Sequence, residues 1–86
     1  MLWTVYILEC ADATLYTGIT SDLDRRVEQH ESGQGAKYTR GRGPLRLVYR
    51  EGCADKSAAL QRELVIKGLS RVEKLELING KRRSKK

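Results

Sequence analysis

The sequence of 86 residues contains no phenylalanine, one tryptophan, one methionine, one proline and only two cysteines. Because aromatic residues are few, aliphatic side chains must supply most of the packing, and a chain of this length predicts a single domain. Folding would remove roughly 60–65% of the unfolded surface from water. Cys10 and Cys53 form no CxxC pair, which argues against a zinc site or a disulfide framework and fits a reducing cytoplasm.

Long hydrophobic runs are also missing. The apolar start, Met1 to Leu8, has no basic leader and is interrupted by Glu9, so it is too short for a membrane span and differs from a signal peptide. We therefore expect a β-strand there and no membrane partner. No composition or motif implies a small-molecule cofactor.

Acidic residues are the minority among the charges, with 11 Asp and Glu against 17 Lys and Arg. The formal net charge is +6 and the pI is about 9.6. Such an excess favours a polyanion such as nucleic acid as partner, although it would also serve solubility alone.

The first half of the chain predicts a β-hairpin followed by a helix. Residues 3–8 and 15–19 are rich in β-branched and aromatic side chains, and turn-prone residues separate them. The next helix should run over residues 22–32, because Leu23 and Val27 lie four apart and Ser21 with Asp24 has capping-box spacing. Gly33 should end it.

The second half predicts one strand and two helices. Residues 45–50 alternate as a strand should, and Gly52 should close it. Asp55 or Ser57 can cap a helix that ends at Lys67 and Gly68. The apolar stripe of this helix is expected to be Ala59, Leu60, Leu64 and Ile66.

A last helix should open at a capping box formed by Ser70 and Glu73 and end at Asn79 and Gly80. Its inward side chains are expected to be Val72, Leu75 and Ile78. We predict an α/β domain over residues 1–80 with a small three-stranded, mainly antiparallel sheet flanked by helices, in the order β-β-α-β-α-α. The basic residues 81–86 are expected to form a disordered tail.

Several side chains could converge on one site. Arg26 and His30 share a helix face beside the stripe of Leu23 and Val27. Tyr6 and Tyr16 share a sheet face only if the hairpin pairs even with even positions, which requires an odd loop or a bulge.

Gly18 would let substrate or another backbone come close to the sheet. The glycine-rich stretch that follows the first helix combines cations with an aromatic ring, an arrangement that tracks a phosphate backbone while stacking a base. Its candidate substrate-binding residues are Lys37, Tyr38, Arg40 and Arg42.

Two tripeptides, Thr4-Val5-Tyr6 and Tyr16-Thr17-Gly18, resemble the pair for which the GIY-YIG nucleases are named. The resemblance runs from Trp3 to about Ile78, and the stretches 35–39 and 62–67 look like the small stand-alone bacterial branch. The sequence departs from the pattern at Thr4, where the name has Gly, and at Ile19, where some repair-type relatives have Lys.

The resemblance implies a metal-dependent endonuclease that hydrolyses phosphodiester bonds in DNA, with DNA repair as a possible setting. It assigns catalysis to Tyr6, Tyr16, Arg26, His30 and Glu63. Tyr16 or the metal would activate water, and Arg26 would stabilise charge at phosphorus. Glu63 would hold Mg²⁺ or Mn²⁺, and Tyr6 and His30 would orient groups or shuttle protons. An unassisted phenol, with a pKa near 10, is a poor base at neutral pH, so the metal or a cation such as Lys37 or Arg40 would have to help.

Simpler explanations compete with these roles. Arg26 could be a surface cation paired with Asp22, His30 a helix-end histidine, and Glu63 an i,i+4 partner of Lys67. The tyrosines could be ordinary strand residues, and the basic loop a solvated one. The chain could also be a binding module without turnover, or act on RNA, whereas its small size favours single-stranded DNA.

Overall fold

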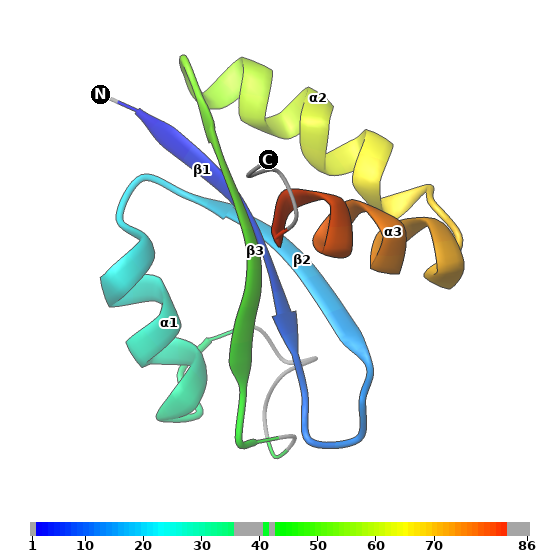
Figure 1. The fold of residues 1–86 in the computed structure, drawn as a ribbon. Helices are drawn as coiled ribbons and strands as arrows, with labels where there is room; N and C mark the ends of the chain where they lie inside the picture. The colour runs from blue at the N-terminus through cyan, green and yellow to red at the C-terminus, as the bar shows by residue number, and fades with distance from the viewer. Residues whose placement is uncertain (1, 36–40, 42, 83–86) are drawn as a thin grey trace.

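The structure is a computed structural model that describes residues 2–35, 41 and 43–82 of the chain. Its elements follow the predicted order β-β-α-β-α-α (Figure 1). They are β1 (Trp3–Glu9), β2 (Leu15–Thr20), α1 (Leu23–Glu31), β3 (Arg46–Cys53), α2 (Lys56–Lys67) and α3 (Arg71–Arg82).

The sheet has three strands in the order β2-β1-β3, and both pairings are antiparallel. In the β1–β2 hairpin, Tyr6 lies opposite Gly18 and Leu8 lies opposite Tyr16. Even positions therefore pair with even positions, as the odd-length loop of residues 10–14 requires. Tyr6 and Tyr16 consequently point to the same face of the sheet.

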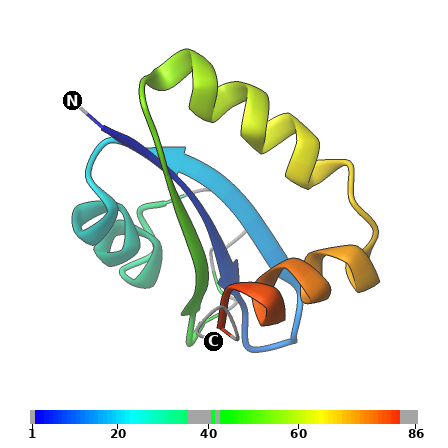
Figure 2. The same ribbon diagram turned by 45° about the horizontal axis from the view of Figure 1, so that its top comes forward.

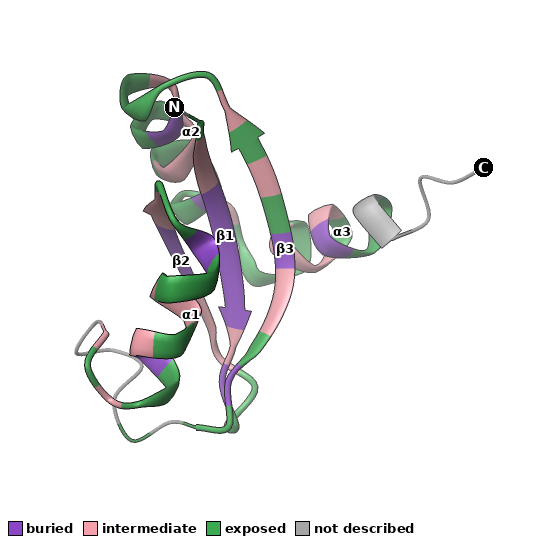
Figure 3. Cartoon of the chain, turned by 90° about the vertical axis from the view of Figure 1, so that its left-hand side faces the viewer, coloured by how far each residue is buried: buried purple, intermediate pink, exposed green. Residues whose placement is uncertain are grey.

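Helices cover both faces of the sheet, and β1 is buried between them (Figures 1 and 2). On the odd face, Val5 and Ile7 pack against Ala59 and Ile66 of α2 and Ile78 of α3. On the even face, Tyr6 and Leu8 pack with Leu23 of α1 and with Leu45. Figure 3 shows the resulting unbroken buried stretch along β1. Strands buried on both faces read as continuous apolar runs, which explains the composition of residues 5–8.

Side chains cap the three helices. The Asp22 carboxylate accepts from the backbone N–H of Arg25 at 3.3 Å, so Asp22 and not Ser21 caps α1. Asp55 caps α2 in the same way at 2.9 Å. The predicted capping box of α3 is confirmed, since Ser70 and Glu73 exchange hydrogen bonds of 2.9 and 3.1 Å.

Two predicted element ends are wrong, because each was placed at a glycine through which the strand or helix continues. Strand β3 does not close at Gly52, which pairs with Thr4, but continues to Cys53. Helix α3 does not end at Asn79 and Gly80 but continues to Arg82. A helical glycine costs only about 1 kcal/mol, which packing such as that of buried Ile78 can offset. The predicted tail therefore begins inside a helix, and residues 83–86 lie outside the described part of the chain.

Three predicted core positions are wrong as well. Leu60, Leu64 and Val72 are 42%, 71% and 65% exposed. Helix α2 turns the side that carries Ala59 and Ile66 toward the sheet, so the two leucines lie on its flank. A helical residue advances by about 100°, and a small rotation of the helix is enough to move a marginal position out of the core.

Candidate active site

Tyr6 and Gly18 form the floor of the candidate site. The Tyr6 side chain is completely buried, and its ring occupies the space that a side chain on Gly18 would need. A Cβ atom built on Gly18 would lie 2.6 Å from the Tyr6 hydroxyl oxygen and 2.7 Å from its Cζ atom. Glycine at this position is therefore a packing requirement of the tyrosine that faces it.

His30 meets Tyr6 from the last turn of α1. The Tyr6 hydroxyl and the His30 Nε2 atom share a buried hydrogen bond of 2.9 Å, and His30 is 2% exposed. The ring centroid of Tyr16 lies 5.2 Å from that of His30 and 6.4 Å from that of Tyr6. We call Tyr6, Tyr16 and His30 the aromatic cluster. Tyr16 is its half-buried member.

Gly35 is a residue of the site that the sequence-based prediction missed. A Cβ atom there would lie 2.7 Å from the His30 Cγ atom and 2.8 Å from its Cα atom. The absence of a side chain thus lets the chain after α1 pass directly against the imidazole. In the sequence, Gly35 is only one of several glycines, and nothing local reveals a contact five residues back.

The surroundings keep both hydrogen-bonded groups neutral near pH 7. Burial raises the pKa of the Tyr6 hydroxyl, the charges of Tyr16 and Glu63 add to the rise, and hydrogen bonding and charge from Arg26 oppose it. Burial also lowers the pKa of His30, and the Arg26 charge lowers it further. A protonated phenol therefore faces a neutral imidazole, and either can donate to the other, depending on the imidazole tautomer.

Arg26 lies one turn before His30, on the same side of α1. Its Nη1 atom donates to Gln29 Oε1 at 3.0 Å, and its half-buried position lets its charge act on both Tyr6 and His30. The guanidinium also acts on the Tyr6 hydroxyl through a hydrogen bond. Among the described residues no ion pair joins it to Asp22, although the surface-pair explanation required one, and Asp22 caps α1 instead. The guanidinium thus remains a positive charge beside the aromatic cluster.

Glu63 lies on α2 with its side chain only 17% exposed. Its Oε2 atom is 3.2 Å from Nζ of Lys67, so the expected i,i+4 ion pair is present. The charge of the same carboxylate makes a small contribution to the raised pKa of Tyr6. The ion pair and a role in the site are therefore compatible.

Few potential metal ligands lie close together in the described part of the chain. Among the residues that the structure describes, no three His, Cys, Asp or Glu side chains gather into a metal-binding group. Glu63 is the acidic side chain whose charge acts on Tyr6. One carboxylate fits Mg²⁺ or Mn²⁺, because Mg²⁺ keeps several waters and often binds through one or two carboxylates plus substrate phosphates.

The candidate substrate-binding residues Lys37, Tyr38, Arg40 and Arg42 lie outside the described part of the chain, so their role stays a prediction. The structure places the other six candidates at or around the aromatic cluster. In the described residues, no helix is long and apolar enough to cross a membrane.

Comparison with known proteins places this geometry in a family. A family model described as the GIY-YIG catalytic domain matches residues 2–76. A UPF0213 protein of Natronomonas pharaonis is 58% identical over 74 residues, which cover 86% of this chain and 87% of that protein. A UPF0213 protein of Staphylococcus aureus is 54% identical, with 86% and 90% covered.

Solved structures agree with these sequence matches. The solution NMR structure of a UPF0213 protein from Bacillus halodurans shares 52% identity and superposes with a TM-score of 0.60, covering 92% of this chain and 84% of that one. A solution NMR structure of a protein from E. faecalis is 32% identical, with a TM-score of 0.61 and 90% and 83% covered. The chain belongs to the GIY-YIG family, a nuclease-type family, and its relatives are small single-domain UPF0213 proteins.

Proposed function

We propose that the protein is a metal-dependent endonuclease that hydrolyses phosphodiester bonds in DNA. The observation that carries the proposal is the buried hydrogen bond between Tyr6 and His30, set beside Tyr16 and within reach of the charges of Arg26 and Glu63. Burying two titratable groups costs stability unless they are paired, and such arrangements concentrate at functional sites.

Each side chain has a role that its surroundings favour. Tyr6 has a raised pKa and is therefore no base at neutral pH, so it holds the imidazole in place. His30 has a lowered pKa and is neutral. Because it is 2% exposed and its Nε2 atom is bonded to Tyr6, its proposed role is to orient the aromatic cluster, or to relay a proton through the Tyr6 hydroxyl when a water molecule attacks phosphorus. Tyr16, which is half-buried, positions and activates that water.

Arg26 supplies positive charge for the oxygens of the phosphate as negative charge develops on them. Its planar guanidinium can donate to two of these oxygens at once, which a lysine does not reproduce. Lys37, Tyr38, Arg40 and Arg42 complete the proposed substrate contacts, whereas Gly18, which was expected to let substrate approach, is buried under the Tyr6 ring and serves packing.

Glu63 would hold Mg²⁺ or Mn²⁺, which supplies positive charge at the phosphate and lowers the pKa of bound water. The position of Glu63 supports this assignment, because a carboxylate on a packed helix keeps its place better than one on a loop.

The decisive experiment compares cleavage and binding in Glu63→Gln and Arg26→Ala. Both variants should fold and bind nucleic acid but lose cleavage by several orders of magnitude. Glu76→Gln and Arg25→Ala are matched controls, because they remove the same charges at exposed positions. If Glu63 served only its ion pair with Lys67, Glu63→Gln would cost a few tenths of a kcal/mol of stability and turnover would persist.

Single-stranded or frayed DNA is the proposed substrate, because a domain this small offers too little surface to encircle a duplex. Cleavage of single-stranded DNA, duplex DNA and RNA with and without Mg²⁺ tests this preference. Faster cutting of the intact duplex would reverse it. Absence of turnover with any divalent metal would favour a non-catalytic binding module on the same scaffold.

A further inference from the structure

The positive charge of the chain is concentrated at its C-terminal end. Residues 67–86 contain eight Lys or Arg and two Glu, whereas residues 1–66 contain nine of each sign. The last quarter of the sequence therefore carries the entire formal net charge of +6. This segment includes α3, which packs on the odd face of the sheet, whereas the aromatic cluster lies on the even face.

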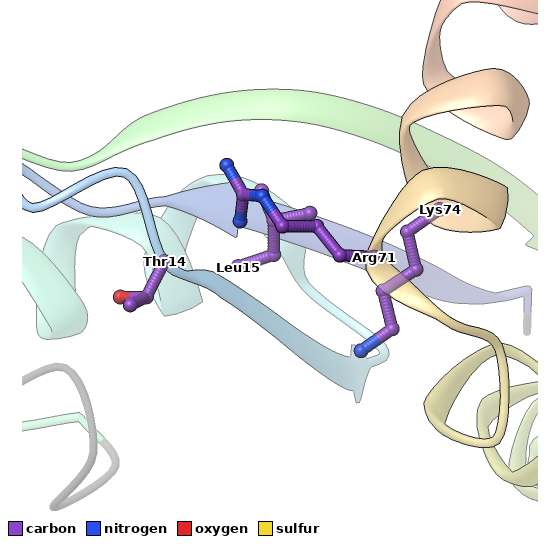
Figure 4. A pocket seen from close by; sticks show the side chains of 4 residues that line it. All are labelled: Thr14, Leu15, Arg71 and Lys74. Atoms are coloured by element: carbon purple, nitrogen blue, oxygen red, sulfur yellow. The ribbon is translucent and has the colours of Figure 1, made fainter.

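A pocket of about 180 Å³ lies where α3 meets the beginning of β2. Its lining residues are Thr14, Leu15, Arg71 and Lys74 (Figure 4). Leu15 forms its apolar floor, and the two cations come from the first turn of α3. In the described part of the chain, neither cationic side chain forms a hydrogen bond or an ion pair with another residue.

The nearby acidic groups are engaged elsewhere. Glu9, which lies opposite Leu15 in the hairpin, pairs with Arg46 at 2.6 Å. The Glu73 carboxylate accepts from the backbone N–H of Ser70 in the capping box. Asp12 accepts from both the hydroxyl and the backbone N–H of Thr14, at 2.6 and 3.2 Å, and so is held within the hairpin turn. The positive end of the α3 dipole adds to the charge of Arg71 and Lys74. An anion thus finds two cations there that no carboxylate pairs with in the described part of the chain.

The pocket and the aromatic cluster share one strand. Leu15 and Tyr16 are consecutive residues of β2, so their side chains point to opposite faces, ~3.3 Å apart along the strand. Strand β2 is an edge strand, with β1 as its neighbour on one side only. A nucleic-acid strand bound at Tyr16 can pass over this open edge and reach Arg71 without crossing the sheet.

We propose that this pocket binds a phosphate group of the nucleic-acid substrate at a distance from the bond that is cut. The proposal rests on the proposed function for its ligand, because both sites would contact one strand. Arg71 would bind two phosphate oxygens through its guanidinium, and Lys74 would add a point charge. The pocket thereby lengthens the footprint of a domain whose reactive side chains occupy a single small area.

The test measures binding of a 20-nucleotide single strand to the full chain, without divalent metal, at several salt concentrations. Arg71→Gln with Lys74→Gln should raise the Kd several-fold and reduce the slope of log K against log salt by about 0.7 for each phosphate that the variant no longer neutralises. Arg25→Gln with Lys56→Gln is the control, since it removes the same charge at exposed positions. Equal losses in the two double variants, or no loss in the first, would overturn the proposal.

Two further measurements separate the possible outcomes. In an NMR titration, the oligonucleotide should shift the backbone amides of residues 71–74, and inorganic phosphate should do so only weakly. Tight binding of inorganic phosphate together with unchanged oligonucleotide affinity in the pocket variant would assign the pocket to a small phosphate ligand and overturn the proposal. In cleavage assays the pocket variant should raise KM and leave kcat unchanged. Pocket-dependent binding by a chain that never cleaves would refute the proposed cleavage and leave the binding of a nucleic-acid phosphate in the pocket intact.

Discussion

Replacing Gly18 with alanine tests whether the aromatic cluster is packed as tightly as the structure indicates. The new Cβ atom would lie 2.6 Å from the Tyr6 hydroxyl oxygen, whereas ordinary contacts begin at 3.4 Å. The hydroxyl would therefore have to retreat by about 0.8 Å, a shift on the order that overpacked cores undergo. Tyr6 is completely buried, so such a shift would stretch or break its 2.9 Å hydrogen bond to His30.

The change in the free energy of unfolding of Gly18→Ala is the sum of opposing effects. Overpacking costs about 1–3 kcal/mol, and a broken hydrogen bond adds about 0.5–1.5 kcal/mol. Alanine restricts the unfolded chain and returns about 0.4–1 kcal/mol. Gly18→Ala should therefore lower the free energy of unfolding by about 0.5–4 kcal/mol. For a domain of this size, Tm falls by roughly 4–8 °C for each kcal/mol.

Gly52→Ala is the matched control, because it is also a strand glycine paired with β1 but has nothing within 4 Å of its added Cβ atom. Thermal unfolding followed by circular dichroism should show the control unchanged or slightly more stable. The NMR signals of the His30 ring should move in Gly18→Ala and not in Gly52→Ala. Equal Tm values for the two variants would refute the assignment of Gly18 to the packing of Tyr6.

Three other predictions concern single features of the chain. Burial and the Arg26 charge hold the pKa of His30 in the folded protein below 6.5, so below that pH the unfolded state binds more protons. The free energy of unfolding should therefore be level above pH 6.5 and fall below it. His30→Gln removes the chain's one histidine and should flatten the dependence of the denaturant midpoint on pH between pH 7 and 5. Thr17→Val removes a buried hydroxyl that has no partner among the described residues, so it should leave the free energy of unfolding unchanged or raise it by about 1 kcal/mol. Thr20→Val is the control: it loses a hydrogen bond from the backbone N–H of Asp22 and should lower Tm. Replacing Tyr38 with alanine should weaken binding of single-stranded DNA by about 1–3 kcal/mol, because a stacked base loses its partner. A triple-alanine variant that changes Lys37, Tyr38 and Arg40 should bind more weakly still, because charge is lost as well. Unchanged affinity in the triple variant would exclude these residues from the binding site.

The sequence predicted those parts of the fold that depend on local chemistry. The capping box of α3 followed from two side chains three residues apart. For the hairpin, only the condition under which Tyr6 and Tyr16 share a face could be derived, and the register meets it. Predictions failed where tertiary contacts decide. Gly52 is kept in β3 by its pairing with Thr4, and the rotation of α2 that exposes Leu64 depends on what the sheet offers to Ala59 and Ile66.

The candidate site could be predicted only in part for a related reason. Its residues lie far apart in the chain, and each has an ordinary explanation when taken alone. Only the resemblance to a family, which rests on their order and spacing, grouped them into one site. Gly18 could be singled out because a strand glycine is unusual. Gly35 could not, because its requirement arises from the imidazole of His30, which only the folded chain brings against it.

Stability and the proposed catalysis depend on the same atoms at one end of this site and on different atoms at the other. Tyr6, Gly18 and His30 lie in the even-face core, so any change there alters packing, and a loss of activity would not by itself reveal a chemical role. Arg26 and Glu63 are partly exposed; Arg26 donates to Gln29 and also acts on the Tyr6 hydroxyl, and Glu63 pairs with an exposed lysine. Removing either charge disturbs little of the core, which is why variants at these two positions, and not at the buried tyrosine, can separate an enzyme from a folded domain that only binds.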